Sequence, residues 1–452
     1  GNILTTDNSK SFDQINKDVF GVSDSANEWW SEWSYAKNSI DHTIKLTGYN
    51  GSKTTYQFPL KATINDVEYS VIFGSGSPSY DQAQIDLGTI TSLSFEKGFI
   101  LPTDCSYFFA CLKLTSLDLS GVDASKVTNM KDMFYNCNAL TSLNLSGFNT
   151  SNVTSMYGMF SNCSALTSLD LSSFNTSEVT DMSAMFGDCS ALTSLDLSNF
   201  DTSKVTKMIY MFNQCHSLIS LNLNNFNTSK VTDMRGMFKA CNSLKSLDLS
   251  SFNTSEVISM SNVTSDYADG MFAGCSSLTS AGVNTEDKKY ALNFGNNFDT
   301  SKVTSMNSLF YGCSSLINLD LSNLNTSKVT NMERMFDSCS SLASAGVNTE
   351  TEEYALNFGE NFITSNQIRI SMWMMFGNCS SLTKLDLSNL NTSKVTNMGW
   401  MLKDCSSLQN IKMPNTMNAE STIKLSALSL PSQNASNEGI SWYSLASGAK
   451  TG

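Results

Sequence analysis

The chain has 452 residues, of which 40% are hydrophobic, and carries a formal net charge of −13. This acidity argues against nucleic acids and anionic membranes as partners, because both are bound through basic surfaces. No run of 18 or more apolar residues occurs, so the sequence predicts no membrane-spanning helix. The two histidines, His42 and His216, lie far apart in the sequence, which argues against a histidine-based metal cluster and against a catalytic triad.

Residues 1–84 do not carry the repeat that fills the rest of the chain, and we predict that they form a small α+β domain. The segment 26–36 is expected to be helical, with its aromatic residues on one side. We interpret the domain as a cap, because the open end of a repeat array exposes apolar surface that must be covered. A separate binding domain with the tryptophans as contacts is the alternative. Short strands joined by turns at 50–51 and 65–66 are expected at 43–47, 55–58 and 69–73.

A unit of 26 residues recurs from about residue 85 to residue 415. A fixed period of 20 to 50 residues is typical of one supersecondary unit stacked on itself. The cysteines mark this period, because eleven of the twelve end a variant of the motif Met-Phe-x-x-Cys: Cys111, Cys137, Cys163, Cys189, Cys215, Cys241, Cys275, Cys313, Cys339, Cys379 and Cys405.

One coil, residues 163–189, shows how the unit is expected to fold. The pattern Leu-x-x-Leu-x-Leu-x-x-Phe at 166–174 matches the opening of a leucine-rich repeat. Its central leucines alternate with polar residues, as in a strand with one buried face. The Asn-Thr-Ser sequence at 175–177 predicts a turn, and we interpret Met-Phe at 185–186 as a helical or 3₁₀ turn. The sequence therefore predicts a repeat solenoid, a leucine-rich-repeat-like stack of about 12 coils with short parallel strands.

Equivalent side chains are expected to lie on one another in such a stack, because neighbouring strands are about 4.8 Å apart. Phe160 should thus rest on Phe134 and Phe186, and the cysteines should form a column of their own. Twelve strands are expected, centred on Leu93, Leu117, Leu143, Leu169, Leu195, Leu221, Leu247, Leu292, Leu319, Leu356, Leu385 and Ile411.

The cysteines are predicted to be reduced and structural. The Cβ vectors of stacked equivalents run parallel, whereas a disulfide needs Cβ atoms about 3.8 Å apart, and free cysteine packs as a small hydrophobe. Cys105 lies outside the column and six residues before Cys111, so a bridge between these two is left open. No two cysteines have the close spacing of a zinc knuckle.

Three insertions interrupt the coils, at 261–270, 281–291 and 345–355. The second and third are nearly identical and are expected to leave the coil just before the inner strand, so they should project on the same edge. Insertions in repeat arrays map to loops that often lie on the binding side, which makes Tyr290 and Tyr354 candidate contacts. Neutral drift followed by duplication explains the loops equally well.

Three parts are therefore expected: a capping domain over 1–84, a solenoid over 85–415, and a C-terminal cap or tail over 416–452, where the repeat decays. A further short strand is plausible in that tail, at 425–430.

A polar column is expected on the outward face of the inner strands. We interpret it as either a solvated surface, a contact surface for a protein or glycan, or an array of cation sites. Calcium needs six to eight converging oxygens, which a flat ladder does not supply. The column residues are Asp118, Asn144, Asp170, Asp196, Asn222, Asp248, Asn293, Asp320, Asn357 and Asp386.

The repeated sequence Leu-Thr-Ser-Leu-Asp-Leu-Ser-x-Phe-Asn-Thr-Ser-x-Val-Thr-x-Met-x-x-Met-Phe-x-x-Cys resembles the BspA-type leucine-rich-repeat surface proteins of mycoplasmas, lactobacilli and gut anaerobes. The resemblance covers about residues 85–415. It implies an exported bacterial lipoprotein or wall-attached protein with a role in adhesion. It transfers no catalytic residue and no defined ligand, and residues 1–84 lie outside it.

We therefore expect a non-catalytic adhesion protein on the bacterial cell surface that binds a host or microbial surface protein or glycan, with no cofactor and no metal. Its lipid or wall anchor is expected to lie in a segment outside this sequence. The alternative is a rigid spacer on the cell envelope. Catalysis is disfavoured because the chain has no Gly-rich phosphate loop, no Gly-x-Ser-x-Gly and no His-Glu-x-x-His.

Overall fold

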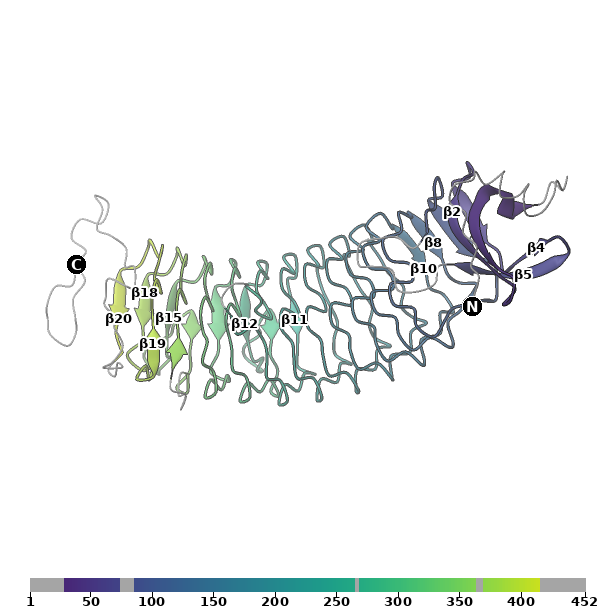
Figure 1. Ribbon diagram of the computed structural model, residues 1–452. Coiled ribbons are helices and arrows are strands. Elements are labelled where there is room, and N and C mark those ends of the chain that lie inside the picture. Colours follow the sequence, from purple (N-terminus) through teal and green to yellow (C-terminus); the bar gives the residue numbers. More distant parts are fainter. Residues whose placement is uncertain (1–27, 74–84, 265–267, 363–368, 415–452) are drawn as a thin grey trace. The chain divides into compact units, whose positions relative to one another are not determined.

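A computed structural model describes residues 28–73, 85–264, 268–362 and 369–414 (Figure 1). It divides into two compact units, which are treated separately. The N-terminal unit comprises Gly1–Val179 and Asp188–Asn199, and the C-terminal unit comprises Thr180–Gly187 and Phe200–Gly452. The predicted tail and its strand at 425–430 lie outside the described residues.

The N-terminal unit begins with a four-stranded sheet of order β1-β2-β5-β4. The helix predicted over 26–36 is wrong for its described part, because only one 3₁₀ turn forms before the chain becomes extended and buries alternate aromatic rings. The three predicted strands are confirmed, and the turn at Asn65-Asp66 closes a two-residue hairpin with both residues at positive φ. The elements are η1 (Trp29–Glu32), β1 (Trp33–Asn38), β2 (Thr43–Tyr49), β3 (Thr55–Phe58), β4 (Lys61–Ile64) and β5 (Val67–Phe73).

Strand β3 is not part of that sheet. It belongs to the sheet of the first coils, which has the order β10-β8-β6-β3. It runs parallel to β6 with Phe58 opposite Phe95. The Phe58 ring lies 5.1 Å from that of Phe73 and 6.2 Å from that of Trp33. Residues before the repeat therefore cover the open edge of β6, which supports their interpretation as a cap. The remaining strands of this unit are β6 (Ser92–Phe95), β7 (Phe99–Ile100), β8 (Ser116–Asp118), β9 (Val122–Asp123) and β10 (Ser142–Asn144).

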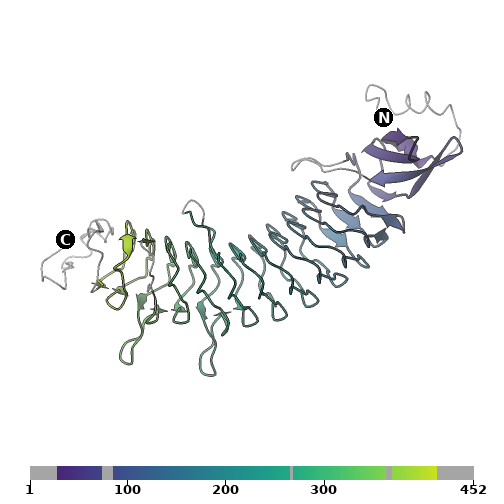
Figure 2. The same cartoon turned by 60° about the horizontal axis from the view of Figure 1, so that its bottom comes forward.

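The C-terminal unit is built around a parallel sheet of order β11-β13-β12-β14-β16-β15-β18-β20 (Figures 1 and 2). A small second sheet pairs β17 with β19. Parallel strands on every coil are the arrangement that a repeat solenoid requires. The strands are β11 (Leu247–Asp248), β12 (Ser280–Gly282), β13 (Leu292–Asn293), β14 (Asn318–Asp320), β15 (Ser344–Gly346), β16 (Leu356–Asn357), β17 (Ile370–Ser371), β18 (Lys384–Asp386), β19 (Val395–Asn397) and β20 (Asn410–Lys412).

Nine of the twelve predicted strand centres lie in strands, and the exceptions are Leu169, Leu195 and Leu221. These three leucines are still buried, at 6 to 8% exposure. The amide of Thr193 reaches the carbonyl oxygen of Thr167 only at 3.5 Å, the outer limit of a hydrogen bond. The side-chain column therefore continues where the backbone ladder is too loose to form a strand.

The predicted helical turn at Met-Phe is wrong, because the described residues contain no helix other than η1. The segment is a series of tight turns, in which the amide of Met133 donates to the carbonyl oxygen of Met130 and that of Cys137 to Phe134. Asp132 and Asn136 have φ of 52° and 59°. A left-handed residue every few positions prevents the chain from continuing as a helix.

Equivalent rings stack from coil to coil, as predicted. The Phe134 and Phe160 rings are 5.5 Å apart and inclined by 4°, and the Phe186 and Phe212 rings are 5.7 Å apart and inclined by 7°. All four are fully buried. The core of each unit is therefore a set of continuous aromatic, aliphatic and sulfur columns.

All twelve cysteines are free, so the bridge between Cys105 and Cys111 does not form. Ten thiols donate to a phenylalanine carbonyl of the preceding coil; Cys163, for example, bonds Phe134 at 3.2 Å. Burial raises the pKa of the Cys189 thiol to about 12 and also raises that of Cys163 well above its usual value. The column is therefore structural and chemically inert, whereas Cys111 is only half-buried.

Candidate functional site

Every side chain of the predicted polar column caps a turn. Oδ1 of Asp170 accepts a hydrogen bond from the amide of Ser172 at 2.9 Å, and Asp196 does the same for Ser198. These hydrogen bonds lower the pKa of both carboxyls. The same bond to the amide two residues on is made by Asp118, Asn144, Asn222, Asp248, Asn293, Asp320, Asn357 and Asp386.

Part of the column is open to solvent. Asn144, Asp170 and Asp196 are exposed in the N-terminal unit, and Asn222 and Asp248 are exposed in the C-terminal unit. Asp118, at the first coil, is half-buried. We call the three exposed residues of the N-terminal unit, Asn144, Asp170 and Asp196, the open column.

The last four residues of the column, Asn293, Asp320, Asn357 and Asp386, lie beside the two inserted loops, here called the tyrosine loops (283–291 and 347–355). Each loop follows an inner strand and returns as a second parallel strand, so Ala281 pairs with Leu292 and Ala345 with Leu356. Each loop therefore lies directly before the predicted strand at Leu292 or Leu356, as expected, but a further inner strand that was not predicted, β12 or β15, precedes it. Both loops extend from the same side of the C-terminal unit (Figure 2).

Each tyrosine ring lies on a glycine of the strand before its loop, and this glycine pairs with a column residue, Asn293 or Asn357. A Cβ atom on Gly282 would be 2.6 Å from the Tyr290 ring, and one on Gly346 would be 2.6 Å from the Tyr354 ring. The rings are 8% and 6% exposed. Tyr290 and Tyr354 therefore hold the loops in place, and the rings themselves offer little surface to a partner.

The tyrosine hydroxyls point to carboxylates of the column. That of Tyr354 donates to Asp386 at 2.9 Å, and that of Tyr290 lies 3.4 Å from Asp320. Two column amides also link coils, because Nδ2 of Asn293 donates to Asp248 and Nδ2 of Asn357 donates to Asp320. The predicted residues Tyr290, Asp320, Tyr354 and Asp386 are thus brought together in two pairs.

The second pair is supported by lysines. Lys412 binds Asp386 at 2.8 Å, and Lys384 forms an ion pair with Glu352 of the second loop. Burial opposes ionisation of Asp386, but hydrogen bonds from Lys412 and Ser388 outweigh it and lower its pKa to about 2. The pKa of Tyr354 is raised by burial and by its bond to Asp386. Both charge states are fixed at neutral pH, which indicates a structural role.

The third insertion packs against the coils beside it. Ser261 lies 2.9 Å from Ser305 through their hydroxyl oxygens, and Lys239 forms an ion pair of 2.6 Å with the buried Asp269. These contacts were not predicted, because the sequence gives no sign of which coil the insertion covers. Residues 265–267 of the insertion lie outside the described part.

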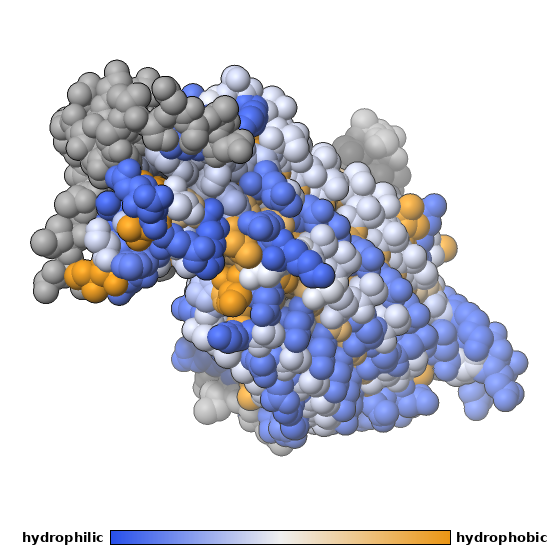
Figure 3. Space-filling model, turned by 90° about the vertical axis from the view of Figure 1, so that its right-hand side faces the viewer, coloured by the Kyte–Doolittle hydropathy of each residue, from blue (hydrophilic) through white to orange (hydrophobic). Residues whose placement is uncertain are grey.

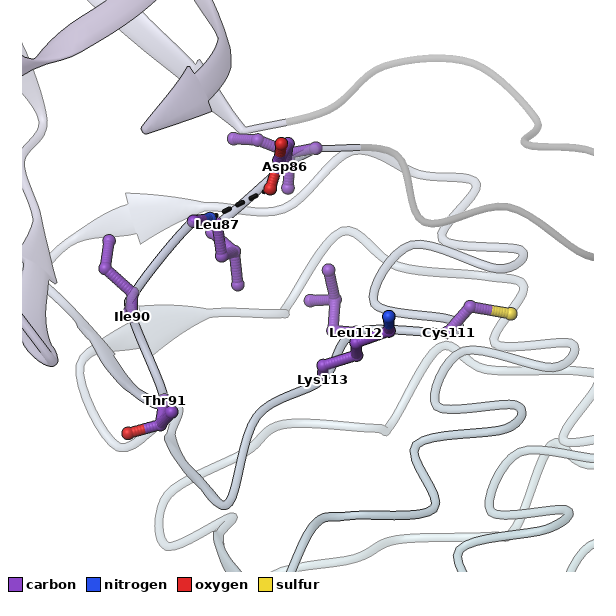
Figure 4. A pocket seen from close by; sticks show the side chains of 9 residues that line it. Asp86, Leu87, Ile90, Thr91, Cys111, Leu112 and Lys113 are labelled. Atoms are coloured by element: carbon purple, nitrogen blue, oxygen red, sulfur yellow. Dashed lines mark hydrogen bonds between the residues drawn. The ribbon is translucent and has the colours of Figure 1, made fainter. Parts of the chain in front are cut away.

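A cavity of about 450 Å³ lies in the N-terminal unit (Figure 4). Its apolar lining is Ile85, Leu87, Ile90 and Leu112, and Asp86 is its one carboxylate. Asp86 already accepts the amide of Gly88 at 2.9 Å. The cavity therefore holds no pair of carboxylates for acid–base chemistry.

The described residues contain no group of three or more histidine, cysteine, aspartate or glutamate side chains that could hold a metal ion. They also contain no helix with the length and hydropathy needed to cross a bilayer. The face shown in Figure 3 is mostly hydrophilic, with hydrophobic residues confined to small patches.

Comparison with known proteins gives one family match. The family described as "Mycoplasma protein of unknown function, DUF285" matches residues 103–218, 188–289, 267–365 and 360–436. No curated protein matches the chain.

Among solved structures, a leucine-rich cell surface protein of Faecalibacterium prausnitzii is similar at 16% identity, over 89% of this chain and 97% of its own, with a TM-score of 0.36. A leucine-rich repeat protein of Bacteroides ovatus is similar at 16% identity, over 86% and 92%, with a TM-score of 0.35. An internalin of Listeria monocytogenes is similar at 18% identity, over 71% and 79%, with a TM-score of 0.20.

Proposed function

The chain belongs to the DUF285 family, and we propose that it is a non-catalytic bacterial surface protein that binds a protein or glycan through its open column. The open column carries this proposal, because it is a regular row of exposed polar groups that are each held in place by a hydrogen bond to the backbone two residues on. The tyrosines of the inserted loops are left out of the contact surface, since they are buried.

The open column is ordered before any partner arrives. The oxygens of Asp170 and Asp196 are held by backbone amides two residues on. A partner would therefore meet side chains that lose little conformational freedom on binding, which favours affinity. The amide and carboxylate groups point outward at a spacing of about 4.8 Å from coil to coil.

The chemistry of the open column favours recognition over catalysis. The pKa values of Asp170 and Asp196 are lowered by their hydrogen bonds, so both carboxyls are ionised at neutral pH. Neither has the raised pKa that a general acid needs. Repeated ionised and amide groups suit a broad contact with hydroxyl-rich glycans or with polar protein surfaces.

We place the protein outside the bacterial cell, attached by a lipid or wall-linked segment. The buried, inert thiols are compatible with an oxidising medium, because burial raises their pKa values and keeps them in the unreactive protonated form. Protease treatment of intact cells tests the location: the protein should be cleaved without lysis, and protection until lysis would contradict it.

The binding role is tested by blocking the open column with arginines beside it. Ser168 and Ser194 are exposed next to Asp170 and Asp196, so Ser168→Arg with Ser194→Arg adds bulk without removing a turn cap. Binding is measured on a mammalian glycan array and on immobilised extracellular-matrix proteins. A partner bound by the wild type should be lost by this variant.

The matched control is Ser151→Arg with Ser177→Arg, which makes the same change at the Asn-Thr-Ser turns of the same unit. The control should bind normally. Equal binding by wild type and both variants would contradict the open column as the contact surface.

A rigid spacer is the alternative function. It is favoured by one observation: all ten column side chains are already engaged in turns, so their repetition is explained by folding alone. A spacer would bind no probe with any variant. Deleting the tyrosine loops does not separate the two functions, because it removes rings that pack on Gly282 and Gly346.

A further inference from the structure

Two tryptophans lie side by side on successive coils of the C-terminal unit. The ring centroids of Trp373 and Trp400 are 5.9 Å apart and the rings are inclined by 33°. Trp400 is 49% exposed, and Trp373 is partly exposed. The pair lies in the Met-x-x-Met turns of that unit.

The pair departs from the repeat. The two residues between the methionines are small or polar in several other coils of this unit, such as Ser183-Ala184, Arg235-Gly236 and Asn307-Ser308. One further coil of the unit carries an aromatic residue there, Tyr210, which is half-buried. The three coils named first stack equally well without an aromatic residue at this position. Stacking therefore does not require an indole at this position. Two adjacent indoles with exposed surface form one contiguous apolar patch, and such patches mark interaction sites.

The surroundings shape the pair into one platform. A Cβ atom on Gly399 would lie 3.2 Å from Cδ1 of Trp373, so the indole rests on the next coil where a side chain is missing. Nζ of Lys403 lies 4.8 Å from the centre of the Trp400 ring. The neighbouring side chains of Asn397 and Asp404 are exposed and polar.

We propose that Trp373 and Trp400 form a platform that binds a pyranose ring of a glycan. Indole faces are electron-rich and attract the polarised C–H groups on the apolar face of a sugar. The Lys403 ammonium lies over the Trp400 ring, and a sugar that takes its place there would leave this group at the sugar's edge as a donor to its hydroxyl groups.

A sugar fits this surface better than a protein does. Among the described residues that follow Ile317 in the sequence, Trp400 is the one large hydrophobic residue that is exposed. A tryptophan at the centre of a protein interface is surrounded by other contacts that exclude water. Here the apolar area is limited to two rings with a polar edge, which matches the size and polarity of one or two sugar units.

The platform is independent of the open column, so the two proposals can fail separately. If the Ser168→Arg, Ser194→Arg variant loses its partner but still binds sugar, the surfaces are distinct. If the tryptophan variants lose sugar binding alone, the open column is unaffected.

The test uses hexasaccharides of β-linked glucose, β-linked N-acetylglucosamine, mannose and galactose in isothermal titration calorimetry with the full chain. At least one should bind saturably. Trp373→Ala and Trp400→Ala should each weaken binding about tenfold or more, as expected for loss of a tryptophan contact, and Trp400→Tyr should keep part of it. Ile258→Ala is the matched control, because Ile258 has the same 49% exposure in the same unit.

Absence of binding by all four sugars, or binding that survives both alanine substitutions together, would overturn the platform. Fluorescence gives a second measurement, from the difference between wild type and Trp400→Phe. The Trp400 emission should be quenched readily by acrylamide and should shift to shorter wavelength on saturation with the bound sugar. An emission already shielded from acrylamide would show that another part of the chain covers the ring, which contradicts the proposal.

Discussion

The thiol of Cys189 donates a hydrogen bond to the carbonyl oxygen of Phe160, 3.1 Å away in the preceding coil. Nine further cysteines repeat this bond along the two units, so one buried side chain per coil ties each coil to its neighbour. The same oxygen also accepts the amide of Cys163 at 3.1 Å, so the thiol supplies a second hydrogen bond that alanine could not make.

Cys189→Ala should lower the free energy of unfolding by about 1 to 2 kcal/mol, through the lost hydrogen bond and the small cavity. Urea unfolding followed by circular dichroism measures the change. Cys111→Ala is the control, because Cys111 is only half-buried and a smaller loss is expected there. Equal losses at both positions would argue against a special role for the buried bond.

Stability should fall as the pH rises above 9. The Cys137, Cys241 and Cys313 thiols have pKa values raised by burial from 9.0 to about 12. Thiols of the unfolded chain ionise from about pH 9, whereas those of the folded chain stay protonated. Between pH 9 and 12 the unfolded state is therefore stabilised relative to the folded state, and the free energy of unfolding decreases. The urea midpoint at pH 10 should therefore be lower than the midpoints at pH 7 and 9. A midpoint that is the same at all three pH values would contradict the burial of the thiols.

Phe186→Ala should cost about 3 to 5 kcal/mol, as for other large buried aromatic side chains. The ring is fully buried and stacks on Phe212 at 5.7 Å. Chemical unfolding measures the loss. Ile219→Ala, at an exposed position of the same unit, should change the unfolding free energy little.

Tyr354→Phe should destabilise the C-terminal unit by about 1 to 2 kcal/mol, because it leaves a buried carboxylate without one of its donors. Tyr290→Phe is the matched comparison, since its hydroxyl lies 3.4 Å from Asp320 and makes a weaker contact. Thermal unfolding should rank the two substitutions in that order. A reversed order would show that the loops are held mainly by their rings.

Asp170→Asn should leave stability unchanged or slightly higher. Asparagine can cap the same turn, as Asn144 and Asn222 do, and the change removes repulsion between Asp170 and Asp196. Thermal melts with and without 5 mM calcium (roughly the level that fills weak extracellular sites) measure both the stability and any binding of calcium. A large loss, or a melting point raised by calcium in the wild type alone, would revive the cation-site alternative.

The period of the cysteines predicted the stacked coils, because an inward residue type can repeat only if each coil occupies the same space as the last. It could not predict the local backbone of the Met-Phe turn. Asp132 and Asn136 adopt left-handed conformations, and an apolar pair such as Met133-Phe134 is common to helices and to such turns.

The tyrosine loops show a second limit of sequence reasoning. The sequence showed the insertions and their place before the strands at Leu292 and Leu356, but it did not show the additional strands β12 and β15 that precede them. One signal in the sequence could have indicated these strands. Gly282 and Gly346 each stand where other coils have the polar column residue, and each lies eight positions before a tyrosine. A glycine in an otherwise constant column marks the place where another group lies on the backbone.

Electron paramagnetic resonance of paired spin labels tests the stacking of equivalent residues most directly. The labels are attached at Ser168→Cys and Ser194→Cys in a Cys111→Ala background, whose remaining native thiols are buried. Because neighbouring coils are about 4.8 Å apart, the two labels should lie within about 10 Å of each other. The doubly labelled chain should therefore show strong dipolar broadening that disappears in urea. Spectra equal to the sum of the two single labels in the folded protein would contradict the stacked architecture and the surfaces built on it.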